Sequence, residues 1–273
     1  MRFDVGGHPV YAYGGSRAFD RTLPTVVFVH GAANDHGVFA QQSRYFAWHG
    51  MNAVALDLPG HGRSGGAALA SVEALADWLR DVVDALGLRD ASIVAHSMGA
   101  LAALECAARY PDRVKRLALL GPSAPMPVSD DLLAAAAAND HVAYELINGW
   151  SFAPSSQLGG NEVPGLWMLG NAMRLMERTR ENVLSVDLVA CNGYVNGVDA
   201  ATRVRCPTLV VLGARDIMAP PRNAKALIDA LPDVRTTVLP DTGHSLMTER
   251  PGEVLDQLRK FLGIGPWPLN PAT

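Results

Sequence analysis

Residues 93–100 read IVAHSMGA, and this stretch decides the fold because an apolar run leads straight through Ser97 into an alanine- and leucine-rich segment. Two small residues, Ala95 and Gly99, flank the serine at a distance of two positions on either side. A sharp turn from strand to helix strains the central residue and leaves little room beside it, which is the layout of a nucleophile elbow. The pattern predicts Ser97 as a nucleophile; the alternative is a serine that only caps the following helix.

The chain around this elbow alternates between short apolar runs and amphipathic segments. The runs are continuous rather than alternating, which is typical of parallel strands that helices cover on both faces. They lie at residues 25–30, 52–58, 91–96, 116–120 and 208–213. The clearest helix spans residues 71–86 and ends before Gly87. The sequence therefore predicts an α/β fold with a mostly parallel sheet flanked by helices, and residues 2–5 and 10–13 as its antiparallel edge.

The alternation stops after residue 121 and returns at residue 208. The stretch between begins with a proline-rich break and contains a glycine-, serine- and proline-rich segment at residues 151–164. Helical patterns span residues 130–147, 166–178 and 181–194. We therefore expect three parts, which are the first part of the core at residues 1–122, a helical cap at 123–204, and the second part of the core at 205–273.

Composition excludes several classes of protein. With 49% hydrophobic and 18% charged residues, the chain of 273 residues is expected to be globular rather than disordered. The formal charge of −4 and the lack of a basic run argue against a nucleic-acid partner. No segment is long and apolar enough for a membrane span, and the amino terminus lacks a signal peptide, which together predict a cytoplasmic location.

Three cysteines lie far apart in the sequence. Cys106, Cys191 and Cys206 are odd in number and form no CxxC motif. Neither a disulfide framework nor a zinc site is indicated. We expect reduced thiols that serve mostly in packing.

A serine nucleophile needs a general base, and His244 is the candidate among the eight histidines. It lies in the loop PDTGHS, directly after the strand-like segment at residues 234–239 and before a helix. Asp216 follows another strand and could orient the base, although capping of the next helix is its alternative role. His61 is expected to order a glycine-rich turn, and His96 to face away from the serine that follows it.

Two backbone N–H groups are candidates for an oxyanion hole. Ala32 follows Gly31 in the loop after an early strand, where glycine permits close approach of the backbone. The N–H of Met98 lies at a helix N-terminus, where developing negative charge is stabilised. The alternative for the loop is an ordinary turn with a satisfied His30.

Ser97, Asp216 and His244, in this order and each at a strand end, resemble the α/β-hydrolase superfamily, in particular its carboxylesterase-like members with a serine nucleophile and a helical cap. The His-Gly loop at residues 30–31 and the turn at 57–64 also fit that family's sequence. The resemblance implies an eight-stranded sheet with a cap inserted after the sixth strand. It also implies chemistry that requires no metal or organic cofactor.

The expected function is hydrolysis of a small or medium, mainly apolar carboxylic ester through an acyl-enzyme. Trp150, Trp167 and Met168 of the cap are the candidates for contact with this small-molecule ester substrate. The sequence leaves open whether the protein is a monomer or a homodimer.

Three other functions stay open at this point. A carbon–carbon bond hydrolase acting on a diketone would use the same three side chains. An aminopeptidase would need a cap carboxylate for the substrate ammonium, with Glu145, Glu162 and Glu177 as candidates. A non-hydrolytic, cofactor-free enzyme or a ligand receptor could use the same scaffold, and failure of a serine-directed phosphonate to label Ser97 would favour it.

Overall fold

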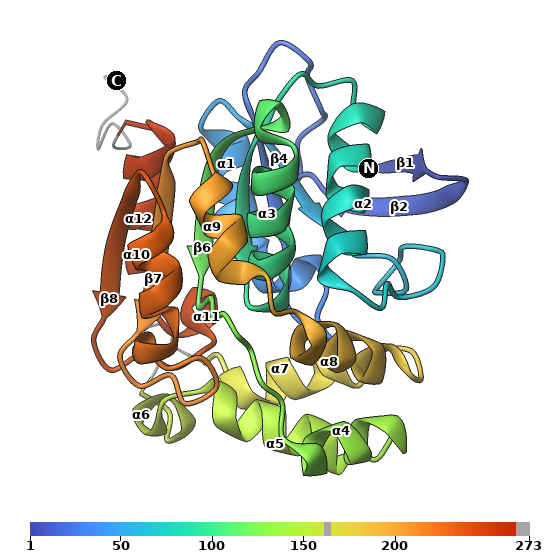
Figure 1. Ribbon diagram of the computed structural model, residues 1–273, viewed down its shortest axis with the longest axis vertical. Helices are drawn as coiled ribbons and strands as arrows, with labels where there is room; N and C mark the ends of the chain where they lie inside the picture. The colour runs from blue at the N-terminus through green and yellow to red at the C-terminus, as the bar shows by residue number, and fades with distance from the viewer. Residues whose placement is uncertain (161–164, 266–273) are drawn as a thin grey trace.

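The computed structural model describes residues 1–160 and 165–265, and its centre is an eight-stranded sheet (Figure 1). The strand order is β1-β2-β4-β3-β5-β6-β7-β8. The strands are β1 Arg2–Val5, β2 His8–Tyr13, β3 Thr25–Val29, β4 Asn52–Leu56, β5 Ala91–His96, β6 Val114–Leu120, β7 Thr208–Gly213 and β8 Val234–Leu239.

The sheet is parallel except at one edge. β1 pairs with β2 and β2 with β4 in antiparallel fashion, whereas every pair from β4 to β8 is parallel. β3, β4, β5 and β7 are buried along their whole length, as their continuous apolar sequences predict. The predicted fold class and the antiparallel edge are both confirmed.

Helices cover both faces of this sheet. One face packs against α2 (Val72–Ala85), α3 (Met98–Arg109), α9 (Gly197–Arg203) and α10 (Lys225–Ala230). The other face packs against α1 (Ala40–Trp48), α11 (Leu246–Glu249) and α12 (Pro251–Leu262). Short 3-10 helices are η1 (His36–Phe39), η2 (Pro111–Arg113) and η3 (Pro221–Ala224). The two apolar layers hold the sheet rigid, so the loops at its carboxyl edge have a fixed base.

Helix α2 shows how local sequence sets the boundaries of an element. Ser71 is its N-cap, and its hydroxyl oxygen accepts a hydrogen bond from the N–H of Ala74. Leu75 and Leu79 lie on its buried face. After the helix, Gly87 adopts a φ of 69°, a left-handed conformation that favours glycine.

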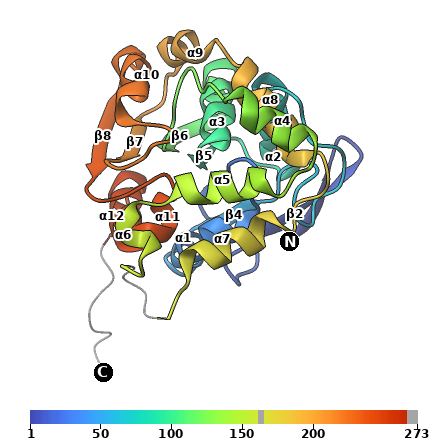
Figure 2. The same cartoon turned by 90° about the horizontal axis from the view of Figure 1, so that it is seen from below.

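Between β6 and β7 the chain forms a helical layer across the carboxyl edge of the parallel strands (Figure 2). Its helices are α4 (Asp130–Ala137), α5 (Val142–Ser151), α6 (Pro154–Gln157), α7 (Met168–Met176) and α8 (Val183–Gly193). α4, α5 and α8 share an apolar cluster that includes Leu132, Ile147 and Leu188. α9, at the end of the same stretch, leaves this layer and packs against α3 and α10.

The helix predicted at residues 130–147 is wrong as one element, because the chain breaks into α4 and α5. Asn139 follows α4 with a φ of 53°, in the left-handed region that ends many helices. The N–H groups of Asn139 and Asp140 turn back to the carbonyls of Ala136 and Ala135. An asparagine can adopt this conformation at modest cost, so a run of good helix formers ends there.

None of the helices in the two described ranges is both long enough and apolar enough to cross a membrane. Cys106 and Cys191 are buried, Cys206 is half-buried, and all three are free thiols. Burial raises the pKa of Cys206 to about 11 and that of Cys106 to about 12. These two thiols therefore stay protonated near neutral pH, as packing residues do.

Candidate active site

Ser97 occupies the sharp turn between β5 and α3. Its φ is 54° and its ψ is −121°, a conformation that costs energy for any residue other than glycine. The backbone is closely packed near the serine. A Cβ atom at Gly99 would lie 2.4 Å from the carbonyl oxygen of His30, so only glycine fits there. The surrounding strands and α3 thus hold Ser97 in a half-buried, strained position at the carboxyl edge of the sheet.

The structure brings Ser97, His244 and Asp216 together in one hydrogen-bonded chain. Nε2 of His244 lies 2.9 Å from the Ser97 Oγ, and Nδ1 lies 2.7 Å from Oδ2 of Asp216. Because the carboxylate can only accept, Nδ1 carries the ring proton, and Nε2 is then the acceptor for the serine hydroxyl. The three side chains come from loops that follow β5, β7 and β8. The tautomer that a general base needs is therefore fixed by Asp216.

Asp216 is held by more than the imidazole. Its Oδ1 accepts hydrogen bonds from the N–H groups of Met218 at 2.9 Å and Ala219 at 2.8 Å. Burial by itself would raise the pKa of Asp216, but the hydrogen bonds from His244 and from the N–H of Ala219 help to outweigh burial and lower it. The side chain is therefore an ionised acceptor, as well as the cap of its own loop.

His96 lies closer to the site than expected, because it lines the cavity beside Ser97 instead of facing away. Its Nε2 donates to the carbonyl oxygen of His244 at 2.9 Å, and the two rings lie 4.7 Å apart. Burial, which disfavours the charged form, lowers the pKa of His96 to about 3. The strained turn reorients the chain at the end of β5, which strand alternation alone does not reveal.

The two candidate oxyanion donors belong to residues in or next to the segments that contact Ser97. The loop after β3 passes so near that a Cβ on Gly31 would lie 3.0 Å from the Ser97 Cβ. Met98 is the first residue of α3, so its N–H is one of the free donors at a helix N-terminus. Neither this N–H nor that of Ala32 donates to another residue within 1–160 or 165–265. Both are thus available to an oxygen bound beside the serine.

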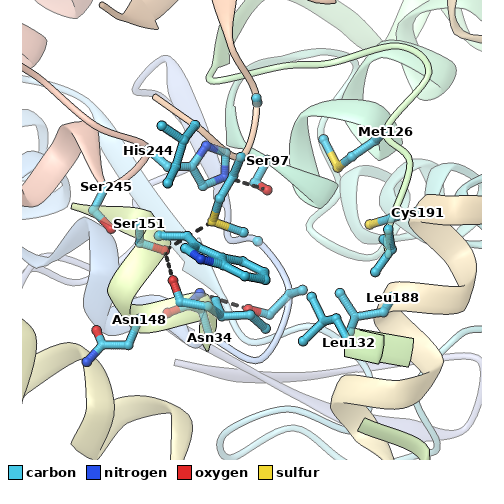
Figure 3. A pocket seen from close by; sticks show the side chains of 18 of the residues that line it. Asn34, Ser97, Met126, Leu132, Asn148, Ser151, Leu188, Cys191, His244 and Ser245 are labelled. Atoms are coloured by element: carbon cyan, nitrogen blue, oxygen red, sulfur yellow. Dashed lines mark hydrogen bonds between the residues drawn. The ribbon is translucent and has the colours of Figure 1, made fainter. Parts of the chain in front are cut away.

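A cavity of about 340 Å³ opens onto Ser97 and His244 beneath the helical layer (Figure 3). This volume suits a small or medium ligand. Its apolar lining includes Met126, Val128, Leu132, Ile147, Trp150, Met176, Leu188, Cys191, Ile217 and Met218. Its polar lining includes Asn34, Ser129, Asn148, Ser151 and Ser245. The cavity is mainly apolar, with uncharged hydrogen-bonding groups at several points.

Only one of the three predicted substrate contacts lies in this cavity, and it is Trp150. Trp167 is 74% exposed at the start of α7, where its indole covers Gly170. Met168 is buried at 2% exposure in the packing of the helical layer. Sequence reasoning also missed Leu188 and Cys191 of α8, because only the packing of α8 against the core turns them toward Ser97.

Two of the three candidates for an ammonium site in the cap, Glu145 and Glu177, lie away from the cavity. Glu145 and Glu177 each accept a hydrogen bond from the ring of His141, at 3.0 Å, on the exposed surface of the helical layer. Neither residue lines the cavity. Glu162 lies outside the residues that the structure describes.

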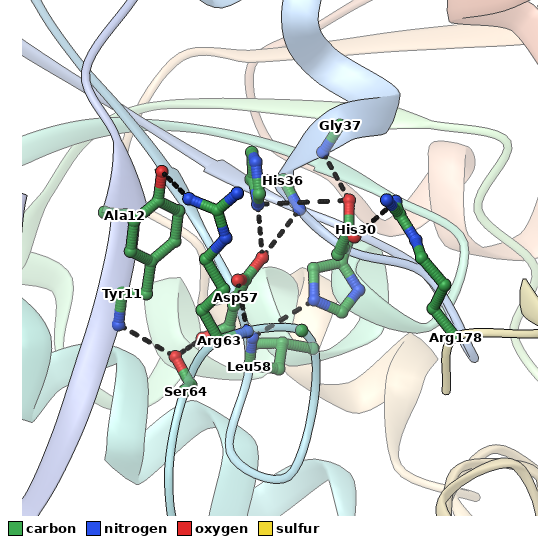
Figure 4. Close-up of polar contacts among 12 residues, drawn as sticks. Tyr11, Ala12, His30, His36, Gly37, Asp57, Leu58, Arg63, Ser64 and Arg178 are labelled. Atoms are coloured by element: carbon green, nitrogen blue, oxygen red, sulfur yellow. Dashed lines mark hydrogen bonds and ion pairs between the residues drawn. The ribbon is translucent and has the colours of Figure 1, made fainter. Parts of the chain in front are cut away.

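Asp35, His36 and Asp57 lie near enough to one another to suggest a cation site. Protein donors already use the oxygens of Asp57, however (Figure 4). Nδ1 and the N–H of His36 lie 2.7 Å and 2.8 Å from Oδ1, and the N–H of Arg63 donates to Oδ2 at 2.8 Å. These contacts lower the pKa of Asp57 despite its burial, which alone would raise it. The cluster thus orders the turn after β4.

Comparison with known proteins places the chain in a family. The sequence model of the family described as alpha/beta hydrolase fold matches residues 24–251. A pimeloyl-[acyl-carrier protein] methyl ester esterase from Chromobacterium violaceum is 32% identical over 234 residues, which cover 81% of this chain and 87% of that protein. A 2-hydroxy-6-oxo-6-phenylhexa-2,4-dienoate hydrolase from Burkholderia cepacia is 26% identical over 80% of each chain.

Among solved structures, the enol-lactonase from Burkholderia xenovorans LB400 superposes with a TM-score of 0.83 at 21% identity, over 96% of this chain and all of that one. This likeness concerns the fold. Together with the family match, it shows that the chain belongs to the α/β-hydrolase family, as its sequence motifs predict. The protein is a hydrolase of the α/β type.

Proposed function

We propose that this protein is a serine carboxylesterase that cleaves small or medium, mainly apolar esters through an acyl-enzyme. The proposal depends on one observation, which is that the hydrogen-bonded chain from Asp216 through His244 to Ser97 ends at an apolar cavity. The relative from Chromobacterium violaceum, whose name describes a methyl ester esterase, supports the same reaction type.

In the first step, Oγ of Ser97 attacks the carbonyl carbon of the ester while Nε2 of His244 takes the hydroxyl proton. Asp216 stabilises the imidazolium that forms, because its carboxylate lies 2.7 Å from Nδ1. The imidazolium then gives its proton to the alcohol oxygen as the C–O bond breaks. The alcohol leaves and the acyl group stays on Ser97.

The tetrahedral intermediate carries its negative charge on the former carbonyl oxygen. The N–H groups of Ala32 and Met98 are the donors that we assign to this oxygen, since Met98 follows Ser97 directly and Ala32 follows Gly31, whose backbone passes close to the Ser97 side chain. Water then attacks the acyl-enzyme, with His244 as base, and returns Ser97 to its free state.

The helical layer is assigned as a cap that selects the acyl group. Residues 123–204 supply Leu132, Trp150 and Leu188 to the cavity, opposite the loops that carry Ser97 and His244. The cavity favours an uncharged acyl chain because apolar side chains dominate its wall. Trp150 is the aromatic contact that we retain from the sequence.

The test is turnover of a panel of p-nitrophenyl esters, from acetate to octanoate, by the wild type and by Ser97→Ala. The proposal expects turnover by the wild type, with a loss of about 10⁴-fold or more in the variant. Ser16→Ala is the matched control, because Ser16 is an exposed serine that contacts the Tyr13 hydroxyl, in a loop outside the cavity. Equal rates for Ser97→Ala and the wild type would refute the assignment.

A carbon–carbon bond hydrolase is the second candidate, and the relative from Burkholderia cepacia favours it. The same serine, histidine and aspartate would serve that reaction on a vinylogous diketone. Turnover of such a diketone without turnover of any ester in the panel would decide for this alternative. Ester turnover without diketone turnover would decide for the carboxylesterase.

A further inference from the structure

We propose that Asp187, on α8 of the helical layer, is a positioning residue for the loop after β3 that contains Ala32, here called the oxyanion loop. Asp187 acts together with a protonated His61. The inference rests on the proposed function, because it assigns a role to residues that hold the loop containing Ala32. It connects α8 of the inserted helical layer with the backbone N–H that we assign to the oxyanion.

The carboxylate of Asp187 contacts the loop directly. Its Oδ2 accepts a hydrogen bond from the N–H of Ala33 at 2.9 Å, within the buried interior. Ala33 has a φ of 51°, a left-handed conformation that is strained for alanine and needs support from its surroundings. The carbonyl of Ala33 accepts from the hydroxyl of Thr179 at 3.1 Å. The inserted segment thus holds Ala33 by both its N–H and its carbonyl.

The same contacts set the peptide plane next to the proposed donor. The N–H that Asp187 binds belongs to the peptide between Ala32 and Ala33. The carbonyl of that peptide accepts from the Asn34 side chain at 2.9 Å. With both ends of this peptide fixed, the backbone around Ala32 has little freedom to rotate. The orientation of the Ala32 backbone, which carries the N–H that we assign to the oxyanion, therefore depends on Asp187.

His61 supplies the second hydrogen bond to Oδ2 of Asp187. Its Nε2 lies 2.9 Å from this oxygen, and its Nδ1 lies 3.0 Å from the carbonyl oxygen of Pro59. A carbonyl and a carboxylate are both acceptors, so both ring nitrogens must donate, which only the imidazolium can do. The buried pair is therefore an ion pair, in which each charge compensates the other.

The neighbouring His30 is neutral, whereas His61 is protonated. Its Nδ1 donates to the carbonyl of Gly31 at 2.8 Å, while its Nε2 accepts from the N–H of Leu58 at 3.1 Å. One nitrogen donates and the other accepts, so His30 is neutral, and burial with the nearby charge of His61 lowers its pKa to about 3. The two rings lie only 4.9 Å apart. The hydrogen-bond partners, rather than burial alone, decide which of the two carries the charge.

The charged groups around His61 agree with this assignment. Asp187 faces it from α8, and Asp57 acts from the loop after β4. The guanidinium of Arg180 lies over the same turn, where it donates to the carbonyls of Gly62 and Ser64. Burial alone would lower the pKa of His61, but the carboxylates and hydrogen bonds outweigh burial and raise it. The ion pair therefore holds the proton on His61 more tightly than water does.

An oxyanion donor matters in the transition state more than in the bound substrate, so its displacement lowers kcat and leaves KM nearly constant. Asp187→Asn keeps the size of the side chain but removes the charge that retains the proton on His61. We expect kcat for p-nitrophenyl acetate to fall about tenfold, less than the loss of a donor itself. The affinity for a trifluoromethyl ketone, which forms an oxyanion on Ser97, should fall by the same factor.

Glu105→Gln is the matched control. Glu105 is also a buried carboxylate, and it accepts a hydrogen bond at 2.6 Å from Tyr194 at the far end of α8. The variant loses a buried contact between α8 and the core but leaves the oxyanion loop alone. We expect it to lower Tm without lowering kcat. Asp187→Asn should differ from it by the loss in kcat and in ketone affinity.

Two results would overturn the inference. One is an Asp187→Asn variant with wild-type kcat and wild-type ketone affinity. The other is a neutral His61 in the wild type, measured at pH 7 by nitrogen-15 shifts of the imidazole, with the spectrum assigned through His61→Gln. The second measurement needs no activity, so it decides the protonation state even where the variant folds poorly. Failure of the proposed function itself would be recognised separately, because Ser97→Ala would then turn over esters at the same rate as the wild type.

Discussion

The carboxylate of Asp216 accepts a hydrogen bond from Nδ1 of His244 across 2.7 Å, and both side chains are nearly fully buried. This contact places the ring proton on Nδ1 and leaves Nε2 free to accept from Ser97. Asp216→Asn would instead present an amide N–H to the ring and favour the wrong tautomer. We expect kcat for ester hydrolysis to fall on the order of 10⁴-fold, with little change in fold.

The control for this variant is Asp241→Asn. Asp241 lies in the loop before His244, but its side chain is 65% exposed beside Arg215. Steady-state kinetics on both variants should show a large loss in kcat for Asp216→Asn only. A comparable loss in both would assign the effect to loop disturbance rather than to the tautomer.

Gly99→Ala is expected to destabilise the protein strongly. The added Cβ would meet two backbone oxygens, that of His30 at 2.4 Å and that of Val29 at 2.7 Å, which cannot move aside as a flexible side chain can. We expect the free energy of unfolding to fall by about 3 kcal/mol, at the upper end for overpacking. Urea denaturation measures this loss. Gly252→Ala, in α12 with open space around the glycine, should instead be neutral or stabilising by about 0.5 kcal/mol.

Leu188→Ala should change the acyl preference. Leu188 lines the cavity opposite Ser97, so its truncation makes room for a longer acyl chain. We expect the ratio of kcat/KM for octanoate to that for acetate to rise about tenfold, since a few methylene groups gain apolar contact. Leu184→Ala, one turn earlier on α8, removes a buried leucine that does not line the cavity. An equal change in the ratio for Leu184→Ala would show that the cavity wall does not set acyl length.

The His61 ion pair predicts a loss of stability at alkaline pH. The pKa of His61 is raised above the ordinary value of 6.5, so the pair contributes fully below pH 6.5. This contribution is lost as pH rises through the raised pKa, because the folded protein then gives up the proton. The measurement is the unfolding free energy of the wild type minus that of His61→Gln, from about pH 6 to pH 9. The difference should shrink with rising pH, and a difference that stays constant would contradict the pairing.

The sequence predicts the core of this fold well, for physical reasons. Strands buried on both faces need mostly apolar residues without alternation. The short apolar runs in the sequence therefore predict β3, β5 and β7. The elbow is also visible locally, since a strand, Ser97 and a helix follow one another directly, although the contacts that demand glycine at position 99 come from the end of β3. Parallel strands bring their following loops to one edge of the sheet, so the proximity of Ser97, Asp216 and His244 follows from topology.

The helical layer is much less predictable. A single asparagine in an alanine-rich stretch divides α4 from α5, and helix propensity does not mark that break. Which side chains face Ser97 depends on how α5, α7 and α8 dock on the core, so the sequence predicts Trp167 at the cavity and misses Leu188. The pair of His61 and Asp187 joins residues 126 positions apart. No local pattern connects two such residues.

The most direct test of the central claim is the mass of the protein during turnover. A sample mixed with p-nitrophenyl butyrate, quenched in acid within milliseconds and digested, should carry a butyryl group on Ser97. The adduct should be absent from Ser97→Ala and should accumulate in a wild-type burst before steady state. Ester turnover with an unmodified Ser97 peptide, or with the acyl group on another residue, would contradict the account.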